Sequence, residues 1–280
     1  MKKINRRSFL AAAGLTAAAL ALTACGGSSS STASSAASSV AASSEAASSS
    51  AAAAELTTVE AGKLTMATNA AFPPYEMTTD AGDFEGIDIE TAQAIADKLG
   101  LELQIDDMDF DAALLSVQQG KADIVMAGVT VTDERKAVMD FSDSYATGIQ
   151  SIIVPEGSDI ASPDDLAGKK IGTQRGTTGY IYCSDDFGDE NVVAYDDGLT
   201  AVQALNNGQV DAVVIDNAPA KEFIAANPGL VILETSYAEE DYAIGLAKGS
   251  SLEDAINSAL EELKADGTLQ SIVDKYISAE

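Results

Sequence analysis

The chain has 280 residues, with 44 acidic and 16 basic side chains, a formal net charge of −28, no histidine and two cysteines. A surface this acidic repels nucleic acid, which proteins bind through clustered lysine and arginine. The composition also excludes zinc sites and histidine-dependent catalytic dyads and triads, so we expect no metal, no cofactor and no nucleic-acid partner.

Residues 1–24 are predicted to be a signal peptide. A basic segment precedes an apolar run, Ser8–Leu22, that is too short to remain as a membrane helix. The run ends in Leu22-Thr23-Ala24-Cys25, which resembles the lipobox of bacterial lipoproteins and implies lipidation of Cys25. The sequence Arg6-Arg7-Ser8-Phe9-Leu10 also resembles a twin-arginine export signal, so both export routes stay open.

Residues 25–55 are predicted to be the lipidated cysteine followed by a tether. Residues 26–54 are almost entirely serine and alanine. Such a segment cannot bury enough apolar surface to offset its ordering entropy, and its serine clusters disfavour the alternative of an alanine-rich helix. We therefore expect an extracytoplasmic protein held at the cell membrane by a lipid, at the cell surface or in a periplasm.

Two segments of the remaining chain read as the same unit. Residues 113–125 align without gaps on residues 201–213. In each, a helix ends at a glycine, and the chain passes through an aspartate into a short apolar strand typical of parallel sheets. Continuing the register places Gly128 opposite Asp216, so both are expected just past the carboxyl ends of equivalent strands.

The segments before each unit extend the pattern. In the first half we predict strand 64–68, helix 86–99 and strand 101–105. In the second half we predict strand 170–174, a helix from about Thr177, strand 191–194 and helix 198–207. Each half is thus βαβαβ, which predicts an α/β protein with two mostly parallel sheets flanked by helices.

The C-terminal segment is expected to complete the first lobe. Leu252–Leu263 carries an apolar helical stripe, Ser251–Asp254 is typical of a capping box, and a second helix should follow at about Leu269–Tyr276. We expect the chain to cross between lobes near 147–152 and to return near 237–243. The predicted lobes are residues 56–148 with 242–280, and residues 149–241.

Two such sheets facing each other predict a cleft, because open α/β sheets bind ligands outside the carboxyl ends of their strands. Six short motifs follow one another along this part of the chain: Asn69–Glu76, Gly86–Glu90, Ala127–Arg135, Asp140–Ser142, Gln174–Thr178 and Val214–Asp216.

In this order, over residues 62–280, the motifs resemble the family 3 extracellular solute-binding proteins, the amino-acid receptors of ATP-driven importers. The resemblance implies a type II periplasmic-binding-protein-like fold with two hinge crossovers. It also implies an L-amino acid as ligand, an ABC permease as partner and a monomeric receptor.

Arg135 is the predicted carboxylate-binding residue. Arginine matches a carboxylate with two parallel N–H bonds, and the family uses the arginine after the Gly-x-Thr segment in this way. The alternative is a surface arginine in the first turn of a helix, which residues 132–134 already cap and charge. Thr177 and Thr178 should begin a helix whose free N–H groups form a second anion contact, and Thr177 can cap the same helix.

Asp216 is the predicted ammonium-binding residue, helped by the Gly128 carbonyl and the Thr130 hydroxyl, with Ala127 beside them. These roles follow from the resemblance. The alternative is that Asp216 or Asn217 only caps the helix that follows.

The resemblance implies that the ligand side chain lies between Phe72 and Phe110, with Asn69 and Gln174 contacting its end. The alternative is that the two aromatic rings only pack in the core. Both amides are neutral, which favours a polar or neutral side chain. Arg175 is either a counter-ion for an acidic ligand or a solvent-facing residue.

An enzyme on the same scaffold is the rival prediction, because some cyclohexadienyl dehydratases resemble these receptors. A dehydratase needs a general acid near the leaving hydroxyl, and Glu76 and Asp216 are the candidates near the cleft. In the receptor interpretation, Glu76 and Asp88 are expected to be structural or exposed, and the protein is not an enzyme.

Overall fold

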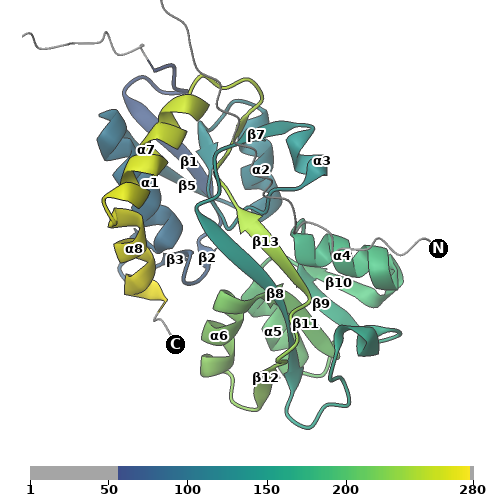
Figure 1. The fold of residues 1–280 in the computed structure, drawn as a ribbon. Coiled ribbons are helices and arrows are strands. Elements are labelled where there is room, and N and C mark those ends of the chain that lie inside the picture. The colour runs from purple at the N-terminus through teal and green to yellow at the C-terminus, as the bar shows by residue number, and fades with distance from the viewer. Residues whose placement is uncertain (1–55, 278–280) are drawn as a thin grey trace, which may run out of the picture. The chain divides into compact units, whose positions relative to one another are not determined.

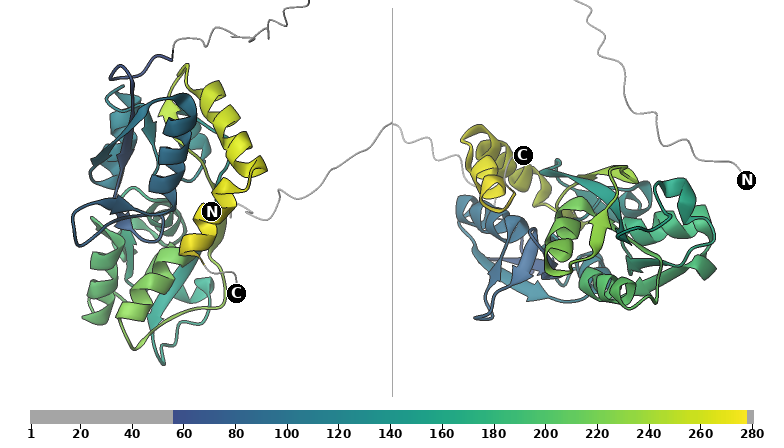
Figure 2. Two further views of the ribbon diagram at one scale, coloured as in Figure 1. Left: turned by 90° about the vertical axis from the view of Figure 1, so that its left-hand side faces the viewer. Right: turned by 90° about the horizontal axis from the view of Figure 1, so that it is seen from below.

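The computed structural model describes residues 56–277, which carry two β-sheets with helices on their faces. Figures 1 and 2 show the C-terminal helices lying on the side of the first sheet. The predicted signal peptide, lipidated Cys25 and tether all lie outside the described residues. Within the described residues, no helix is both long and apolar enough to cross a membrane.

The first sheet, which defines lobe 1, has a parallel core of three strands. The strand at its centre pairs in parallel with the strands on both sides, as the sequence predicts. Two antiparallel strands extend the sheet at one edge. The order is β5 (Glu102–Asp107), β1 (Lys63–Thr68), β6 (Ile124–Val125), β14 (Gly245–Ala247) and β7 (Met139–Phe141). A small antiparallel sheet adjoins it, with strands β2 (Ala71–Phe72), β3 (Glu76–Thr78) and β4 (Phe84–Glu85).

The helices of lobe 1 bury apolar side chains in two core clusters, except for the shortest helix, residues 133–136, which has none. They are α1 (Ile87–Leu99), α2 (Phe110–Gln118), α3 (Asp133–Lys136), α7 (Glu253–Ala265) and α8 (Thr268–Tyr276). Both α7 and α8 contact α1, and Glu90 of α1 accepts hydrogen bonds from Lys275 and Tyr276. The predicted capping box is wrong, because Leu252 occupies the N-cap of α7 and no side chain caps the helix.

The second sheet, which defines lobe 2, repeats the parallel core and adds more antiparallel strands. Strand β8 runs antiparallel to three neighbours. The order is β10 (Val192–Tyr195), β9 (Ile171–Gln174), β11 (Ala212–Asp216), β8 (Ala146–Pro155) and β12 (Leu230–Ile232), with β13 (Ala238–Tyr242) also paired to β8. The helices are α4 (Thr178–Phe187), α5 (Gly198–Asn206) and α6 (Asn217–Ala226), with 3-10 turns at Pro163–Leu166 and Asp189–Asn191.

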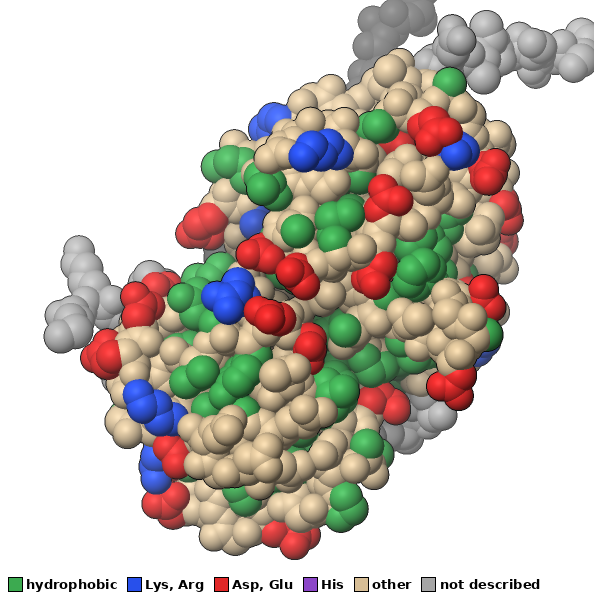
Figure 3. Space-filling model, turned by 180° about the vertical axis from the view of Figure 1, so that it is seen from behind, with side chains coloured by type: hydrophobic (Ala, Val, Ile, Leu, Met, Phe, Trp, Pro, Cys, Tyr) green, Lys and Arg blue, Asp and Glu red, His purple; other side chains and the backbone are tan. Residues whose placement is uncertain are grey.

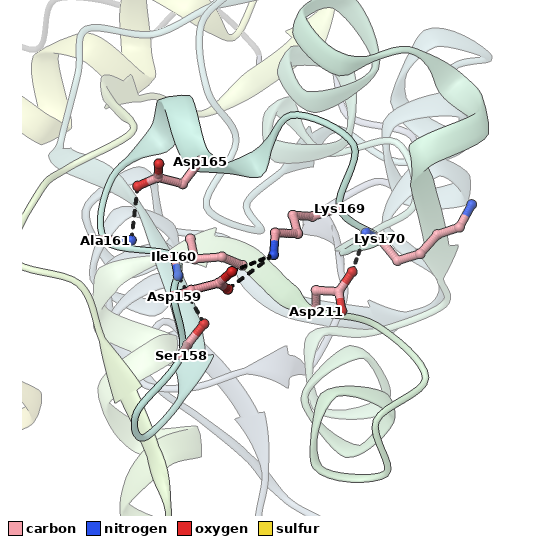
Figure 4. Close-up of polar contacts among 8 residues, drawn as sticks. All are labelled: Ser158, Asp159, Ile160, Ala161, Asp165, Lys169, Lys170 and Asp211. Carbon is pink, nitrogen blue, oxygen red and sulfur yellow. Dashed lines mark hydrogen bonds and ion pairs between the residues drawn. The ribbon is translucent and has the colours of Figure 1, made fainter.

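The two aspartates of the repeated unit perform the same structural task. In lobe 1, Asp123 Oδ2 accepts a hydrogen bond of 2.8 Å from the backbone N–H of Thr65 on β1. In lobe 2, Asp211 Oδ2 accepts one of 2.7 Å from the N–H of Lys170, just before β9 (Figure 4). Each aspartate therefore ties the start of its strand to the first strand of its half.

Two segments connect the lobes. The chain enters lobe 2 along β8 and returns from β13 to β14. On the return, Val131 N donates to Asp241 O at 3.0 Å, and Ala243 N donates to Val129 O at 3.1 Å. The returning strand is thereby bonded to the segment that follows β6.

The surface carries the acidic excess. Figure 3 shows acidic side chains spread over one face, with fewer basic ones among them. The cores contain mainly aliphatic side chains, including Leu64, Ile95 and Ile124 in lobe 1 and Ile153 and Val213 in lobe 2.

Candidate ligand-binding site

A cavity with an empty volume of about 440 Å³, including its opening to solvent, lies where the carboxyl ends of both sets of parallel strands meet. It brings together every residue that the sequence analysis named as ligand-binding: Asn69, Phe72, Phe110, Ala127, Gly128, Thr130, Arg135, Gln174, Thr177, Thr178 and Asp216. Its remaining lining residues are Glu76, Gln150, Val214, Ile215 and Tyr242. Both lobes contribute to the wall.

Arg135 is a buried cation that has no carboxylate within 4.0 Å of its guanidinium among residues 56–277. Helix α3 positions it, and Thr132 caps that helix by accepting a hydrogen bond from Arg135 N. Its Nη1 donates to Thr130 O at 2.8 Å and its Nη2 to Gly176 O at 3.2 Å. The guanidinium carbon lies 5.4 Å from the centre of the Phe110 ring. Burial lowers the pKa of Arg135, and the charge of Glu240 is the strongest opposing influence.

Backbone N–H groups face the same space. Thr130 and Tyr242 form an antiparallel β-bridge, and the residues on either side of them make its hydrogen bonds. The N–H and C=O of Thr130 therefore point away from the returning strand. The carbonyl of Thr130 accepts the hydrogen bond from Arg135 on that side. Across the cavity, Thr177 caps α4 and Thr178 is its first residue, so the first N–H groups of α4 lack helical partners. This is a site for an anion.

Asp216 lies at the end of β11 and does cap α6. Its Oδ1 accepts from Ala218 N at 2.9 Å, and its Oδ2 accepts from Ile149 N at 2.7 Å. Each carboxylate oxygen has a further lone pair, so capping and cation binding are compatible. Burial raises the pKa of Asp216 to about 6, against the effect of these backbone donors. With this pKa the carboxylate is charged at neutral pH, although Asp216 is only 2% exposed.

Gly128 has a conformation that a side chain would oppose. Its φ is +56°, and a Cβ atom at this position would lie 2.9 Å from Phe72 Cε1. The turn aims the Gly128 N–H at Asp88 Oδ2, at 3.0 Å. Glycine thus allows the backbone to line the cavity beside an aromatic ring.

Glu76 lines the cavity and forms a buried acidic pair with Asp88, and both residues are fully buried rather than exposed. Asp88 receives the Gly128 N–H, whereas neither oxygen of Glu76 has a hydrogen-bond donor among the described residues. Burial raises the pKa of Asp88 to about 6, and burial together with the charge of Asp88 raises the pKa of Glu76 well above its usual range. Of the two carboxyl groups, Glu76 is the one whose neutral form is favoured more strongly.

These buried acids predict that the ligand-free protein is more stable at pH 5 than at pH 7.5. The folded pKa values of Asp88 and Asp216, about 6, exceed the ordinary 3.8, so the folded state binds more protons in this interval and stability rises as the pH falls. Each group contributes about 1.4 kcal/mol over this interval, because pH 5 lies one unit below the folded pKa. Thermal unfolding at the two pH values measures the difference.

Asp88→Asn provides the control for this prediction, because the amide oxygen can still accept from Gly128 N. Asp88→Asn should show a smaller gain in stability between pH 7.5 and pH 5 than the wild type. Surface carboxylates whose pKa is lowered, such as Asp140 and Asp165, lose their contribution only near and below pH 3.8. A wild-type protein that is less stable at pH 5 would contradict the assignment.

The far end of the cavity is closed by two amides. Gln174 Nε2 donates to Asn69 Oδ1 at 2.8 Å and to Asp196 O at 3.3 Å, while Asn69 Nδ2 donates to Met108 O at 3.0 Å. Gln174 Oε1 is left as an acceptor at this end. Arg175 lies outside the cavity, with an exposed side chain 3.5 Å from Asp196.

Several residues around the cavity were not predicted as part of it. Gln150 and Tyr242 come from the segments that connect the lobes. Glu76 is placed near the cleft only by the rival enzyme prediction, and the receptor interpretation predicts it to be structural or exposed. Glu240 lies behind the wall on β13. One signal was present: Glu240 and Tyr242 occupy the inward positions of an alternating strand, where a charged residue is unusual.

The comparisons with known proteins identify the family. Residues 64–279 match the bacterial extracellular solute-binding proteins, family 3. The chain belongs to this family. Among its relatives, the L-cystine-binding protein TcyJ of Escherichia coli (strain K12) is 33% identical over 226 residues, which cover 79% of this chain and 85% of TcyJ. The arginine-binding extracellular protein ArtP of Bacillus subtilis (strain 168) is 32% identical over 78% of this chain and 87% of its own.

Solved structures of family members share the fold. An ancestral arginine-binding protein bound to glutamine superimposes with a TM-score of 0.75 at 42% identity, covering 79% of this chain and 100% of its own. The arginine-, lysine-, histidine-binding protein ArtJ of Geobacillus stearothermophilus gives a TM-score of 0.75 at 34% identity, covering 78% and 96%. This solute-binding protein therefore has the type II periplasmic-binding-protein fold. The relatives named here are binding proteins and not enzymes.

Proposed function

We propose that this solute-binding protein is a receptor that holds one L-amino acid between its two lobes and delivers it to an ABC importer. The observation that carries the proposal is the buried Arg135 guanidinium, which has no counter-ion among residues 56–277, in the same cavity as the buried Asp216 carboxylate. A zwitterion supplies an opposite charge to each residue, its carboxylate to Arg135 and its ammonium to Asp216. Arginine and the N–H groups of Thr130 and α4 take the carboxylate, and Asp216 with the Gly128 carbonyl and the Thr130 hydroxyl takes the ammonium.

The relatives support an amino acid as ligand but differ in its side chain. Their names specify cystine for TcyJ and arginine for ArtP, and the ancestral protein is bound to glutamine in one structure and to arginine in another. In this chain the side-chain end is lined by Phe72, Phe110, Asn69 and Gln174, and none of these is charged. We therefore propose a polar or neutral side chain.

A thermal-shift screen tests both parts of the proposal. The panel contains the twenty standard L-amino acids, ornithine, citrulline and cystine, added to the purified chain. A ligand at 100 times its Kd stabilises the protein by about 2.7 kcal/mol, so a strong binder is visible against the rest. No shift with any member contradicts the amino-acid receptor, and a response confined to charged side chains contradicts the polar or neutral preference. Turnover of prephenate or arogenate would instead support a dehydratase.

The anchoring is part of the same proposal. We propose that residues 1–24 are removed, that Cys25 carries the lipid, and that the Ser/Ala-rich segment to residue 55 links it to the lobes. The lipobox-like Leu22-Thr23-Ala24-Cys25 supports this. We propose an extracytoplasmic monomer with lobe boundaries at 56–148 with 242–280 and at 149–241. The mature chain should begin at a lipid-modified Cys25, and mass spectrometry of the mature N-terminus tests this.

A further inference from the structure

Glu240 gathers three side chains at one buried oxygen. Glu240 is only 6% exposed. Its Oε2 accepts three hydrogen bonds of 3.0 Å each, from Thr130 Oγ1, Thr178 Oγ1 and Gln150 Nε2. Its Oε1 is buried and has no hydrogen-bond partner within the described part of the chain. Glu240 does not line the cavity, so its influence on a ligand has to pass through the side chains it touches.

The three donors come from different parts of the molecule. Thr130 follows β6 in lobe 1, Thr178 begins α4 in lobe 2, and Gln150 lies on the connecting strand β8. The two threonine hydroxyls are 3.4 Å apart. A single carboxylate oxygen on the returning strand β13 thus joins both lobes, and these bonds require the lobes to be as close as they are here.

The bonds also fix the direction of the hydroxyl groups. A threonine hydroxyl has one hydrogen and two lone pairs, and a carboxylate can only accept. Thr130 and Thr178 therefore give their hydrogens to Glu240 and turn lone pairs toward the cavity. In this state they can accept from an ammonium group but cannot donate to a carboxylate. That division matches the placement of the backbone N–H groups and Arg135 as the donors.

We propose that Glu240 is a positioning residue that sets the hydroxyls of Thr130 and Thr178 as acceptors for the ligand ammonium and holds the two lobes together around it. The proposal rests on the proposed function. It adds to that function a residue that touches no ligand atom. A neutral residue at position 240 would leave the hydroxyl hydrogens free to turn into the cavity.

Glu240→Gln is the direct test, since the amide has the same shape and can donate as well as accept. For panel members that bind the wild type, calorimetry should show about 10- to 100-fold weaker binding, the loss expected for one weakened bond to a charged group. Dissociation should accelerate more than association slows, as is usual for changes within one interface. Glu239→Gln, an exposed change of the same charge on the same strand, should bind within about twofold of wild type.

The direction of the hydroxyl groups is tested by comparing the affinity for each bound amino acid with the affinity for the 2-hydroxy acid that has the same side chain. The wild type should strongly prefer the amino acid. In Glu240→Gln the preference should shrink, because a hydroxyl turned into the cavity opposes an ammonium but can donate to the hydroxy acid. A general loss of packing would weaken both compounds alike, and an unchanged preference overturns the proposal.

Thr178→Val supplies a second route if Glu240→Gln does not fold, because valine keeps the shape and removes the donor. It should weaken binding in the same direction. Where Glu240→Gln is folded, the double variant should lose less than the sum of the two single losses. Additive losses, or single variants that bind as the wild type does, overturn the role of Glu240. A wild-type protein that binds no panel member instead overturns the proposed function.

Discussion

Replacing Arg135 by alanine should abolish measurable binding of the amino acid while the protein remains folded. Removing one partner of a buried, hydrogen-bonded charge pair costs about 2–5 kcal/mol, or roughly 30-fold to several-thousand-fold in affinity. The cost falls at the upper end here, because no other described cation lines the cavity. Isothermal calorimetry with the amino acid selected in the screen measures the loss.

The fold should survive because, within the described part of the chain, Arg135 has no carboxylate partner to leave behind. Its two hydrogen bonds end on the carbonyl groups of Thr130 and Gly176, and the chain loses an unpaired buried charge. The ligand-free melting temperature should stay the same or rise. Arg135→Lys should be intermediate, since lysine keeps the charge but not the planar fork that matches a carboxylate.

Lys136→Ala is the matched control for the loss of charge. Lys136 is the next residue of α3 and its side chain is exposed, so its removal should leave binding within about twofold. Native affinity in Arg135→Ala would show that Arg135 does not bind the ligand carboxylate. Equal losses in both variants would point to a general effect of charge on this acidic protein.

The parallel core of each lobe could be predicted because its signals are local. A glycine stop, an aspartate and an apolar strand recur in residues 113–125 and 201–213, and Asp123 and Asp211 prove to bond equivalent strand starts. Continuing that register placed Gly128 and Asp216 at strand ends, and both line one cavity. Short-range pattern and strand direction were sufficient for this part of the site.

The contributions of the connecting strands could not be predicted in the same way. Gln150, Glu240 and Tyr242 reach the site through antiparallel pairing of β8 and β13, which are separated by most of lobe 2 in sequence. The alternation along β13 is the one local signal there, and the sequence alone does not show which of its acidic residues turns inward. The capping box failed for a related reason: Leu252, 1% exposed, is held in the core at the N-cap position, and Ser250 rather than Ser251 bonds the turn.

Replacing Asp216 by asparagine should reduce affinity for the amino acid by roughly 100-fold and remove its dependence on pH near 6. A hydrogen bond to a charged group contributes about 1.5–3 kcal/mol, and the ammonium would lose its ionic partner. In the wild type the ammonium favours the ionised form of Asp216, whose pKa is about 6 without ligand. Affinity should therefore fall as the pH drops from 7 to 5, approaching about tenfold per unit below 6.

The variant separates the ammonium contact from the capping role of the same residue. Asparagine can still cap α6 with one oxygen, but its amide meets a second backbone donor at Ile149 or Ala218, so some stability is lost. That loss would weaken every ligand, whereas loss of the ionic contact weakens the amino acid more than the deaminated acid with the same side chain. Asp185→Asn, an exposed change in lobe 2, controls for charge. If Asp216→Asn keeps the wild-type fall in affinity between pH 7 and 5, another group titrates, and Asp216 is a helix cap without a direct role in binding.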